Sequence, residues 1–470
     1  MYEGQFLLSK RQVKLVSVTR EIYKKNARNQ SYVFFLMGQY KNLFPQQQSK
    51  KNMVLAILIY LPVVRERQRH TRTVNFITRK IIMPFKLRDY QQKASDSAVE
   101  FFNSKSEKNG VMVLPTGSGK SLVIADIANR LNGNTLVFQP SREILSQNYA
   151  KMCSYGVLDI SIYSASFNQK KISRITFATI GSVIRHTDQF HHFNNIIVDE
   201  CHLVNAKGGM YEEFIRETKC KVLGLTATPY RLSTSSWGAM LKFITRTRPR
   251  IFSKVIYQVQ IQTLLNMGYL TDLDYYYCPA PLYDERNLMD NSTGADYTDK
   301  SVQEEYQRID FYSWLVQIVR RVMQPKSGRK RNGILVFTRF LKEAQRLANE
   351  IGCCEMVSGD TPKSERERIL EGFKAGDIKV VVNVGVLTTG FDYPELDTVI
   401  MARPTKSLSL WYQIVGRAIR PSPMKERGWV VDLCGNLNRF GKVQDLQLVE
   451  PKPNMWQVQS NGRQLTNVLF

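Results

Sequence analysis

Residues 114–121 of the chain read LPTGSGKS, a spacing that is typical of a loop that binds phosphate groups. Gly117 and Gly119 let backbone N–H groups face an anion with no Cβ in the way. An apolar run precedes the loop and a helical pattern follows it, so the positive end of a helix would face the same anion. Lys120 would reach the β- and γ-phosphates of ATP, and Ser121 would ligate Mg²⁺. The predicted ATP-binding set of the loop is Pro115, Thr116, Gly117, Ser118, Gly119, Lys120 and Ser121.

A second chemical signal lies at residues 196–200, where three apolar residues lead directly into Asp199 and Glu200. The carboxyl ends of buried strands are where α/β sheets bind ligands. Asp199 would hold Mg²⁺ through its water shell, and Glu200 would orient or deprotonate an attacking water. Adjacent acids at such a turn can also form an ordinary helix cap. The phosphate loop upstream favours the catalytic interpretation.

Short apolar runs alternate with helical stretches from residue 83 onward, and each run needs helices on both sides to bury it. Helical spacing is visible at 121–131 and 142–155. Repeated β–α units imply a doubly wound parallel sheet. Two such α/β units are expected, joined by a less regular segment with an acidic stretch at 284–305 and an exposed linker at 326–332. The predicted strands are 111–114, 135–138, 160–163, 175–177, 196–198 and 221–225, then 334–337, 355–357, 380–382, 398–401 and 429–433.

The composition of the chain limits its class. With 470 residues, of which 43% are hydrophobic, it is long enough for two or three domains with sizeable cores. The formal net charge of +25 favours a polyanionic partner, either nucleic acid or an anionic membrane surface, and does not choose between them. The seven cysteines form no C-x-x-C pair, so neither a zinc ribbon nor a disulfide framework is indicated. Their scatter fits a reducing cytosol.

Residues 1–82 differ from the rest, because they hold 16 Lys and Arg against 3 Asp and Glu. The apolar run at 53–64 within them is too short to span a bilayer, which needs roughly 20 residues. It also lacks the cleavage site of a secretory signal. Two interpretations stay open. The segment is either a basic arm that touches nucleic acid or a membrane, or an extension that is not part of the natural product, with Met83 as the start.

With these residues in place, the chain resembles the superfamily 2 helicases. Residues 199–202 read DECH and match the Asp-Glu box of that superfamily, whose last residue is often His. The PTGSGKS form of the phosphate loop, with Leu114 where a general loop has glycine, is also usual there. The resemblance covers residues 84–440, and its many motifs in the right order make it specific. The further motifs are LRDYQ at 87–91 (Q motif), LTATP at 225–229 (motif III), LTTGFD at 387–392 (motif V) and QIVGRAIR at 413–420 (motif VI).

The resemblance implies roles for the residues of the first motifs. Gln91 would read the adenine base, with Tyr90 or Phe85 near it. His202, Thr226 and Thr228 would couple hydrolysis to movement of the nucleic acid strand. In motif V, Gly390 and Asp392 would contact the nucleotide.

Motif VI would complete the catalytic site, because Arg417 and Arg420 would act as arginine fingers beside Gln413. An ATP held by the first domain alone lacks a positive group at the charge that develops on the γ-phosphate. The two arginines are three residues apart, so on a helix they would project from one face and meet this charge opposite Lys120. Such fingers contribute roughly 10³–10⁵ in rate. A solvated or phosphate-binding helix face is the alternative for them.

A nucleic-acid path is also implied, by short motifs that follow strand ends. They resemble motifs Ia (141–143), Ib (179–182), IV (338–339) and V. Such loops offer hydroxyls, backbone amides and an arginine to phosphates and read no bases. Each could also be an ordinary loop cap. The predicted contacts are Arg142, Thr179, Gly181, Thr338, Arg339 and Thr388.

Finer details are similar to the RadD-like helicases, which are bacterial DNA-repair proteins related to the motors of restriction enzymes. The similarity lies in GLTATPYR at 224–231, in the stretch 256–270 that ends in GYL, and in DLCGNLNRFG at 432–441. The chain departs from many relatives because its acidic insert is short and its end carries no cysteine-rich zinc element.

The resemblance implies an α/β fold with two RecA-like doubly wound parallel-sheet domains in tandem. They are expected at 83–245, the ATP-binding domain, and at 325–470, with 246–324 as a linker or insert and 1–82 as a basic extension. The expected function is ATP hydrolysis, with Mg²⁺, that drives movement on DNA or its unwinding in repair, recombination or replication.

Three alternatives stay open for the function. A DEAH-type RNA helicase would keep the chemistry and change the substrate, and the motor subunit of a restriction system would need a separate nuclease chain. A nucleic-acid-binding scaffold with a decayed motor is disfavoured, because Lys120, Asp199, Glu200, Arg417 and Arg420 are all present. The expected partners are nucleic acid, DNA ahead of RNA, and replication or repair proteins, with no membrane. The expected location is the cytoplasm, of a bacterium or of the host of a phage.

A chain that begins at Met83 is predicted to keep its folding stability and its ATP turnover at saturating nucleic acid, because every motif follows that residue. Loss of a net 13 positive charges should weaken nonspecific binding and flatten its salt dependence if the extension touches phosphates. Melting temperature and turnover of the two chains at matched salt provide the check. A shorter chain that melts many degrees lower, or that loses turnover at saturation, would show that the extension packs on the rest of the protein.

Overall fold

The structure is a computed structural model that describes residues 86–468, apart from 236–237, 326–327, 329–330, 332, 389 and 391. The predicted basic extension at 1–82 and most of the predicted linker at 326–332 lie outside the described residues. Within the described residues, no helix combines the length and the apolar character that crossing a membrane requires.

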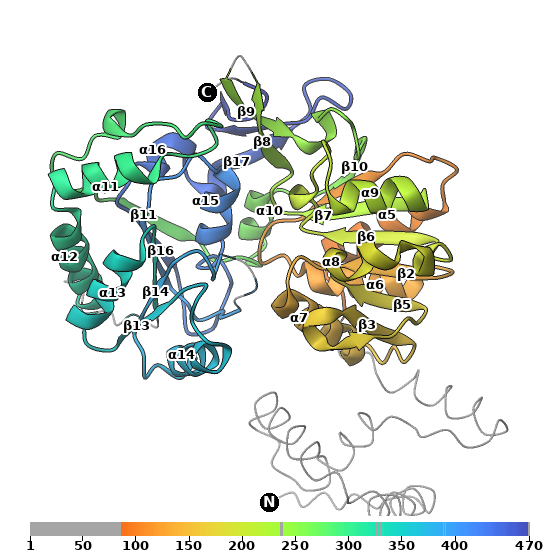
Figure 1. Ribbon diagram of the computed structural model, residues 1–470, viewed down its shortest axis with the longest axis horizontal. Coiled ribbons are helices and arrows are strands. Elements are labelled where there is room, and N and C mark those ends of the chain that lie inside the picture. Colours follow the sequence, from red (N-terminus) through yellow and green to blue (C-terminus); the bar gives the residue numbers. More distant parts are fainter. Residues whose placement is uncertain are drawn as a thin grey trace, which may run out of the picture. The chain divides into compact units, whose positions relative to one another are not determined.

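The first α/β unit is built on an eight-stranded sheet with the strand order β10-β1-β7-β6-β2-β5-β3-β4 (Figure 1). Its neighbouring strands are parallel except for the pair β3 and β4. The strands are β1 (Gly110–Val113), β2 (Thr135–Phe138), β3 (Ile160–Ser164), β4 (Gln169–Lys170), β5 (Ile175–Ala178), β6 (Asn195–Asp199), β7 (Lys221–Thr226) and β10 (Lys254–Gln258). The helices are α5 (Asp89–Asn103), α6 (Lys120–Arg130), α7 (Arg142–Ser154), α8 (Ile180–Val183), α9 (Met210–Thr218) and α10 (Ile261–Asn266).

Alternate residues of these strands enter two separate hydrophobic cores. Met112 and Val137 belong to the core that includes buried residues of α5, α6 and α7. Their neighbours Val111 and Leu136 belong to a core that includes Phe214 of α9. Successive strand residues face opposite sides of a sheet, so helices must cover both faces. This is why the strands read as continuous apolar runs in the sequence.

The second α/β unit has a six-stranded, fully parallel sheet with the order β11-β16-β15-β12-β14-β13. One face packs on α11, α12 and α13 through residues such as Val336, and the other face contributes residues such as Phe337 to the core that contains α14 and α15. The strands are β11 (Leu273–Tyr277), β12 (Ile334–Thr338), β13 (Cys354–Val357), β14 (Val380–Asn383), β15 (Thr398–Ala402) and β16 (Gly428–Asp432). The helices are α11 (Asp299–Arg308), α12 (Phe311–Met323), α13 (Leu341–Glu350), α14 (Lys363–Ala375), α15 (Leu408–Val415) and α16 (Asn436–Phe440).

The expected fold class is confirmed, since the chain has two doubly wound parallel sheets in tandem. Each predicted strand is present to within one residue at either end. The segment 246–324, expected to be a linker or insert, places β10 at the edge of the first sheet and β11 at the edge of the second. It also supplies α11 and α12, so it is part of both units rather than a spacer between them.

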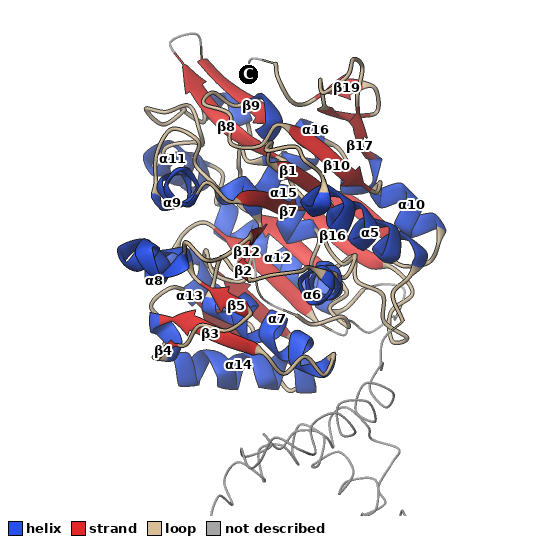
Figure 2. Ribbon diagram, turned by 90° about the vertical axis from the view of Figure 1, so that its right-hand side faces the viewer, coloured by secondary structure: helices blue, strands red, loops and turns tan. Residues whose placement is uncertain are grey.

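Two small antiparallel elements were not predicted. They are the hairpin β8 (Tyr230–Ser235) and β9 (Gly238–Phe243), and the sheet of β17 (Leu446–Val449), β18 (Gln457–Ser460) and β19 (Arg463–Gln464). The C-terminal end of the chain returns to this hairpin, as Figure 1 and Figure 2 both show. The backbone N–H of Asn467 donates to the carbonyl of Leu241 at 2.6 Å. The second unit is thereby connected to the first by a contact in addition to the segment that joins them in sequence.

Replacement of Trp411 is predicted to destabilise the fold strongly. This side chain of α15 is completely buried, and its indole N–H donates to the carbonyl of Gly441 at 3.1 Å. Trp411→Ala should lower the free energy of unfolding by about 3–5 kcal/mol, the usual range for removing a buried tryptophan. Trp411→Phe keeps most of the packing and should cost less. Urea denaturation compares the two variants, and an alanine variant with the wild-type midpoint would contradict the packing described for α15.

Candidate functional site

The predicted phosphate loop lies between β1 and α6, with Gly119 at the N-cap of the helix. Gly117 and Gly119 have φ angles of +83° and +79°, in the left-handed region that favours glycine. A Cβ on Gly119 would lie 2.5 Å from Nε2 of Gln91. The loop conformation therefore depends on glycine at this position.

Two residues of α5 brace the loop. The hydroxyl of Tyr90 donates to the carbonyl of Ser118 at 2.6 Å, and Nε2 of Gln91 donates to the same oxygen at 2.8 Å. Both side chains are buried. Their adenine-reading role stays a prediction. The bracing role was not visible in the sequence, because it depends on how α5 packs beside α6.

The chemistry of the loop fits a bound phosphate group. The hydroxyl of Ser118 is buried and has no hydrogen-bond partner among the described residues. An unpaired buried polar group costs roughly 1–3 kcal/mol, so a phosphate oxygen would be a suitable partner for it. Thr116 of the same loop is also buried, whereas Ser121 is half-buried at the start of α6. The loop residues thus fit the nucleotide that the sequence predicts.

The two predicted carboxylates come together with Lys120 at the end of β6. Oε1 of Glu200 lies 3.1 Å from Nζ of Lys120. Asp199 accepts hydrogen bonds from the backbone N–H of Glu200 at 3.0 Å and from Nδ2 of Asn148 at 3.1 Å. Glu200 has a φ angle of +50°, an unusual conformation for a residue other than glycine. Asn148 was missed by sequence reasoning, because a single polar residue in a helical pattern carries no signal.

The pKa values of the two carboxylates are shifted in opposite directions. Burial, together with the adjacent charge of Glu200, raises the pKa of Asp199. Burial also opposes ionisation of Glu200, but the ammonium group of Lys120 and the imidazole of His202 outweigh it and hold the pKa of Glu200 below its usual value. Glu200 is therefore the carboxylate that stays ionised at neutral pH.

The charge balance of this site fits a divalent cation. Asp199 is buried and the side chain of Glu200 is only 15% exposed, and both carboxylates interact with the ammonium group of Lys120. A cation beside Asp199 would relieve the cost of burying a second carboxylate. The described residues contain no group of three or more His, Cys, Asp or Glu side chains that could hold a metal. Mg²⁺ needs no such group, because it is commonly held by one or two carboxylates together with substrate phosphates.

Motif VI of the second unit contacts the Asp-Glu box of the first, residues 199–202, which is called the acidic box below. Nε2 of Gln413 lies 3.3 Å from Nε2 of His202, whose other ring nitrogen is 3.3 Å from Glu200 and 2.9 Å from the hydroxyl of Thr226. The backbone N–H of Thr228 donates to the same hydroxyl at 3.0 Å. The predicted coupling residues therefore form one chain of polar contacts that joins Glu200 to motif VI.

The two predicted arginine fingers follow this contact but do not share a helix face, so that part of the prediction is wrong. The helix α15 ends at Val415, and Arg417 and Arg420 lie in the turns after it. Pro421 disfavours helical conformation at Arg420, the residue before it, so a helix that carried both arginines would be disfavoured at its last residue. Burial lowers the pKa of each guanidinium to about 10, and for Arg417 the charge of Glu200 acts in the opposite direction.

The space around two glycines shows how closely motif VI approaches the phosphate loop. A Cβ on Gly416 would lie 2.9 Å from Cγ2 of Thr116, and a Cβ on Gly117 would lie 3.6 Å from Cγ of Arg420. Motif VI therefore contacts the phosphate loop directly, as a two-domain ATP site requires.

The predicted nucleotide residues of motif V have other partners. The carbonyl of Gly390 accepts a hydrogen bond from Nε2 of Gln147 on α7 at 2.8 Å. Asp392 forms an ion pair with Arg420. Motif V thus contacts α7 and motif VI, and its contact with the nucleotide stays a prediction.

The predicted nucleic-acid residues are only partly brought together. Arg142 and Thr179 follow the adjacent strands β2 and β5, and Gly181 lies in α8. Thr179 shares hydroxyl contacts with Ser164 and Ser182 at 3.1 and 2.9 Å. Thr388 is half-buried in the loop after β14. Contact of these residues with nucleic acid stays a prediction.

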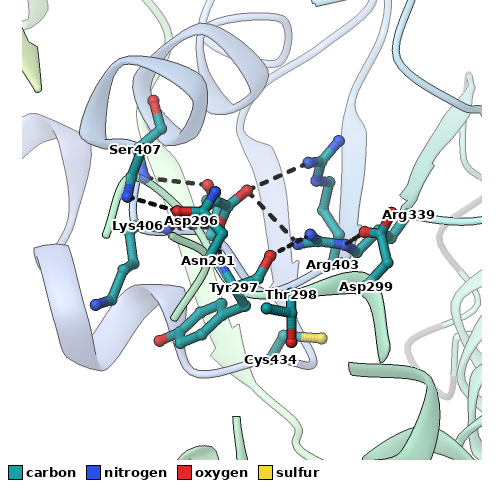
Figure 3. A network of polar contacts seen from close by, with 12 residues as sticks. Asn291, Asp296, Tyr297, Thr298, Asp299, Arg339, Arg403, Lys406, Ser407 and Cys434 are labelled. Atoms are coloured by element: carbon teal, nitrogen blue, oxygen red, sulfur yellow. Dashed lines mark hydrogen bonds and ion pairs between the residues drawn. The ribbon is translucent and has the colours of Figure 1, made fainter. Parts of the chain in front are cut away.

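The motif IV residues of the second unit are enclosed by the acidic stretch. Nε of Arg339 donates to Asp299 at 2.8 Å, and its Nη1 lies 3.5 Å from Asp296, as Figure 3 shows. Its side chain is only 10% exposed. Thr338 is buried, and its hydroxyl has no partner among the described residues. The arrangement holds Arg339 in contacts within the protein and does not present it to a phosphate.

Each of the two units matches the model of a known protein family. Residues 84–231 match the family described as "Type III restriction enzyme, res subunit". Residues 313–422 match the family described as "Helicase conserved C-terminal domain".

Individual relatives are similar over most of the described chain. The putative ATP-dependent helicase IRC3 of Saccharomyces cerevisiae is 25% identical over 374 residues, which cover 74% of this chain and 51% of the relative. The DNA 3'-5' translocase XPB2 of Sulfurisphaera tokodaii is 23% identical, with 71% of this chain and 78% of the relative covered. The chain thus spans about half the length of the yeast protein.

A solved structure supports the fold. The ATP-dependent Type ISP restriction-modification enzyme LlaBIII bound to DNA superimposes with a TM-score of 0.56 at 20% identity. The match covers 74% of this chain and 28% of that one. At this identity the similarity establishes the tandem arrangement of the two sheets.

Proposed function

Because the chain belongs to superfamily 2 of the helicases, of the type that drives restriction enzymes, we propose that it hydrolyses ATP in order to move along or unwind DNA. The observation that carries the proposal is the contact between the acidic box and motif VI. Gln413 reaches His202, and His202 reaches Glu200. A change at the γ-phosphate is then transmitted to the second unit through side chains that are in contact.

The residues of this chain divide the catalytic work. Lys120 and the loop amides bind the β- and γ-phosphates, and Glu200, which is ionised at neutral pH, orients the attacking water and accepts its proton. Ser121 and Asp199 would hold Mg²⁺, which neutralises phosphate charge when bound. Arg417 and Arg420 approach the phosphate from the second unit and stabilise the charge of the transition state.

Movement follows from the two-unit site. ATP binds both units more tightly when they are together, because each supplies part of its contacts. Hydrolysis removes the γ-phosphate that Arg417 and Arg420 contact, so the two units separate and then close again on a new ATP. Nucleic acid held across both units advances when its affinity for the two alternates in that cycle.

DNA is proposed as the substrate ahead of RNA. The translocase XPB2, which is similar over most of its length, acts on DNA by its name, and LlaBIII was solved bound to DNA. A role in repair, recombination or replication rests on the RadD-like details of the sequence. The second candidate is a motor subunit that works with a separate nuclease, and the match of residues 84–231 to the restriction-enzyme family favours it.

The substrate is tested by ATP turnover with single-stranded DNA, duplex DNA and RNA at matched phosphate concentration. Stimulation by either form of DNA and not by RNA would support the proposal. Stimulation by RNA alone would replace it with an RNA helicase. A chain that binds all three and hydrolyses ATP with none would be a scaffold.

Glu200→Gln is predicted to leave ATP binding near the wild-type value and to cut turnover by at least about 100-fold, the scale of a lost general base. The substitution keeps the shape of the side chain and removes its charge. Nucleotide affinity from fluorescence titration and turnover at saturating DNA provide the measurements. Near-normal hydrolysis by this variant would reject the assignment.

Arg417→Ala is predicted to abolish DNA-stimulated hydrolysis, with a loss of roughly 10³-fold or more, while ADP affinity stays close to the wild-type value. The reason is that the charge on the departing γ-phosphate must be met from the second unit. Arg246→Ala, which removes a half-buried arginine in the turn after β9, is the matched control and should turn over normally. Undiminished turnover by Arg417→Ala would mean that the site does not include motif VI.

A further inference from the structure

Lys425 is a buried lysine that the catalytic assignments do not use. It lies between motif VI and β16, and the residue is only 6% exposed. Its Nζ donates to the backbone carbonyls of Pro394 at 3.0 Å, Leu396 at 2.9 Å and Ala418 at 2.9 Å. An ammonium group has three protons to donate, and all three are used here.

These three carbonyls belong to two functional loops. Pro394 and Leu396 follow motif V, and Ala418 lies inside motif VI between Arg417 and Arg420. The ammonium group therefore ties the end of one loop to the middle of the other. The three hydrogen bonds of Lys425 go to backbone oxygens, and the carboxylate of Asp397 acts on its charge without appearing among these acceptors.

The carbonyls that follow in motif VI are fixed as well. The carbonyl of Ile419 accepts from the backbone N–H of Thr271 at 2.8 Å, and the carbonyl of Arg420 accepts from the hydroxyl of Thr271 at 3.3 Å. A Cβ on Gly428 would lie 2.6 Å from the oxygen of Ala418. The backbone on both sides of the Lys425 contact is thus held tightly, and the side chain of Lys425 anchors the carbonyl of Ala418.

Burying a charged lysine is costly unless its protons are all satisfied. An apolar residue could fill the same space at lower cost but would leave three carbonyls without a donor. The structure therefore places a cation where it has a geometrical task, at the turn that carries both predicted arginine fingers.

We propose that Lys425 is a positioning residue for ATP hydrolysis, which holds the backbone of Ala418 so that Arg417 and Arg420 face the γ-phosphate. The inference rests on the proposed role of these two arginines. Lys425 itself touches neither the nucleotide nor the water. It acts through the backbone of motif VI.

The pH dependence gives this role a distinct signature. Burial lowers the pKa of Lys425 to about 8, with Asp397 acting to raise it and Arg420 adding to the decrease. Above that pH the amine is neutral, and its lone pair faces one of the three carbonyls. Turnover should therefore fall as pH rises through about 8.

Folding stability should not follow the same course. Between about pH 8 and the ordinary pKa of lysine, the unfolded chain binds a proton at this residue that the folded chain has released. This group then adds to stability as pH rises. Turnover that falls while the melting temperature does not fall separates positioning from loss of the fold.

The experiment uses the full chain and compares Lys425→Met, Lys425→Arg and a control, Lys363→Met, which removes an exposed lysine of α14. Turnover at saturating ATP and single-stranded DNA and the melting temperature are measured from about pH 7 to about pH 9.5. Affinity is measured for ADP and for ADP with aluminium fluoride, which imitates the transition state. Lys425→Met should lose turnover and aluminium fluoride affinity by at least about 10-fold, with ADP affinity changed by no more than about 2-fold. Lys425→Arg should recover part of the turnover and keep it above pH 8, because a guanidinium stays charged there.

Three outcomes would overturn the proposal. Lys425→Met could turn over normally, it could lose ADP and aluminium fluoride affinity equally, or Lys425→Arg could show the same alkaline decline as wild type. If Lys425→Met does not fold, wild-type turnover and melting temperature against pH decide alone. If turnover and melting temperature declined together as pH rises, the positioning role of Lys425 would be rejected. Arg417→Ala in the same assay separates the two hypotheses, because normal turnover by that variant would refute the arginine-finger site, whatever Lys425 does.

Discussion

The ion pair between Lys120 and Glu200 is the interaction around which the rest of the site is arranged. Both side chains are about 15% exposed, so water screens the attraction weakly. A γ-phosphate that enters the loop competes with Glu200 for the same ammonium group. The carboxylate is then free to act on water, and its pKa rises as the contact with Lys120 weakens, which makes it a better acceptor for the proton of that water. The phosphate loop and the acidic box are thus linked before any second unit is considered.

The contacts of His202 extend this link to the second unit. One imidazole nitrogen lies near Glu200 and Thr226, and the other lies near Gln413. The position of Glu200 therefore affects motif VI through one ring. Because these contacts are short and buried, a shift of Glu200 toward or away from Lys120 cannot leave the ring undisturbed. The path from Glu200 through His202 to Gln413 is enough to couple ATP hydrolysis to movement of the second unit.

Sequence reasoning predicted the central strands, the phosphate loop and the acidic box, because apolar runs and glycine spacing are local signals. It did not find β10 and β11, since edge strands of mixed polarity resemble the irregular segment in which they lie. It placed Arg417 and Arg420 on a helix, although Gly416 and Pro421 surround them. The bracing of the loop by Tyr90, the contact of Asn148 and the burial of Lys425 depend on residues far apart in sequence. No spacing rule could have shown them.

The distribution of charge in the second unit shows why the net charge of the chain does not define its nucleic-acid surface. Arg339 and Arg403 lie beside Asp296 (Figure 3). Lys406 pairs with Asp290, and Arg439 pairs with Glu285 at 2.9 Å. The acidic stretch thereby neutralises four cations that follow β12, β15 and β16 in the chain. Cations paired in this way release no counterions when DNA binds unless their carboxylates are displaced. The formal net charge of +25 already subtracts these carboxylates, so it gives the size of the positive excess but not its place, and the location of the cations that can meet a polyanion follows from the ion pairs rather than from the composition.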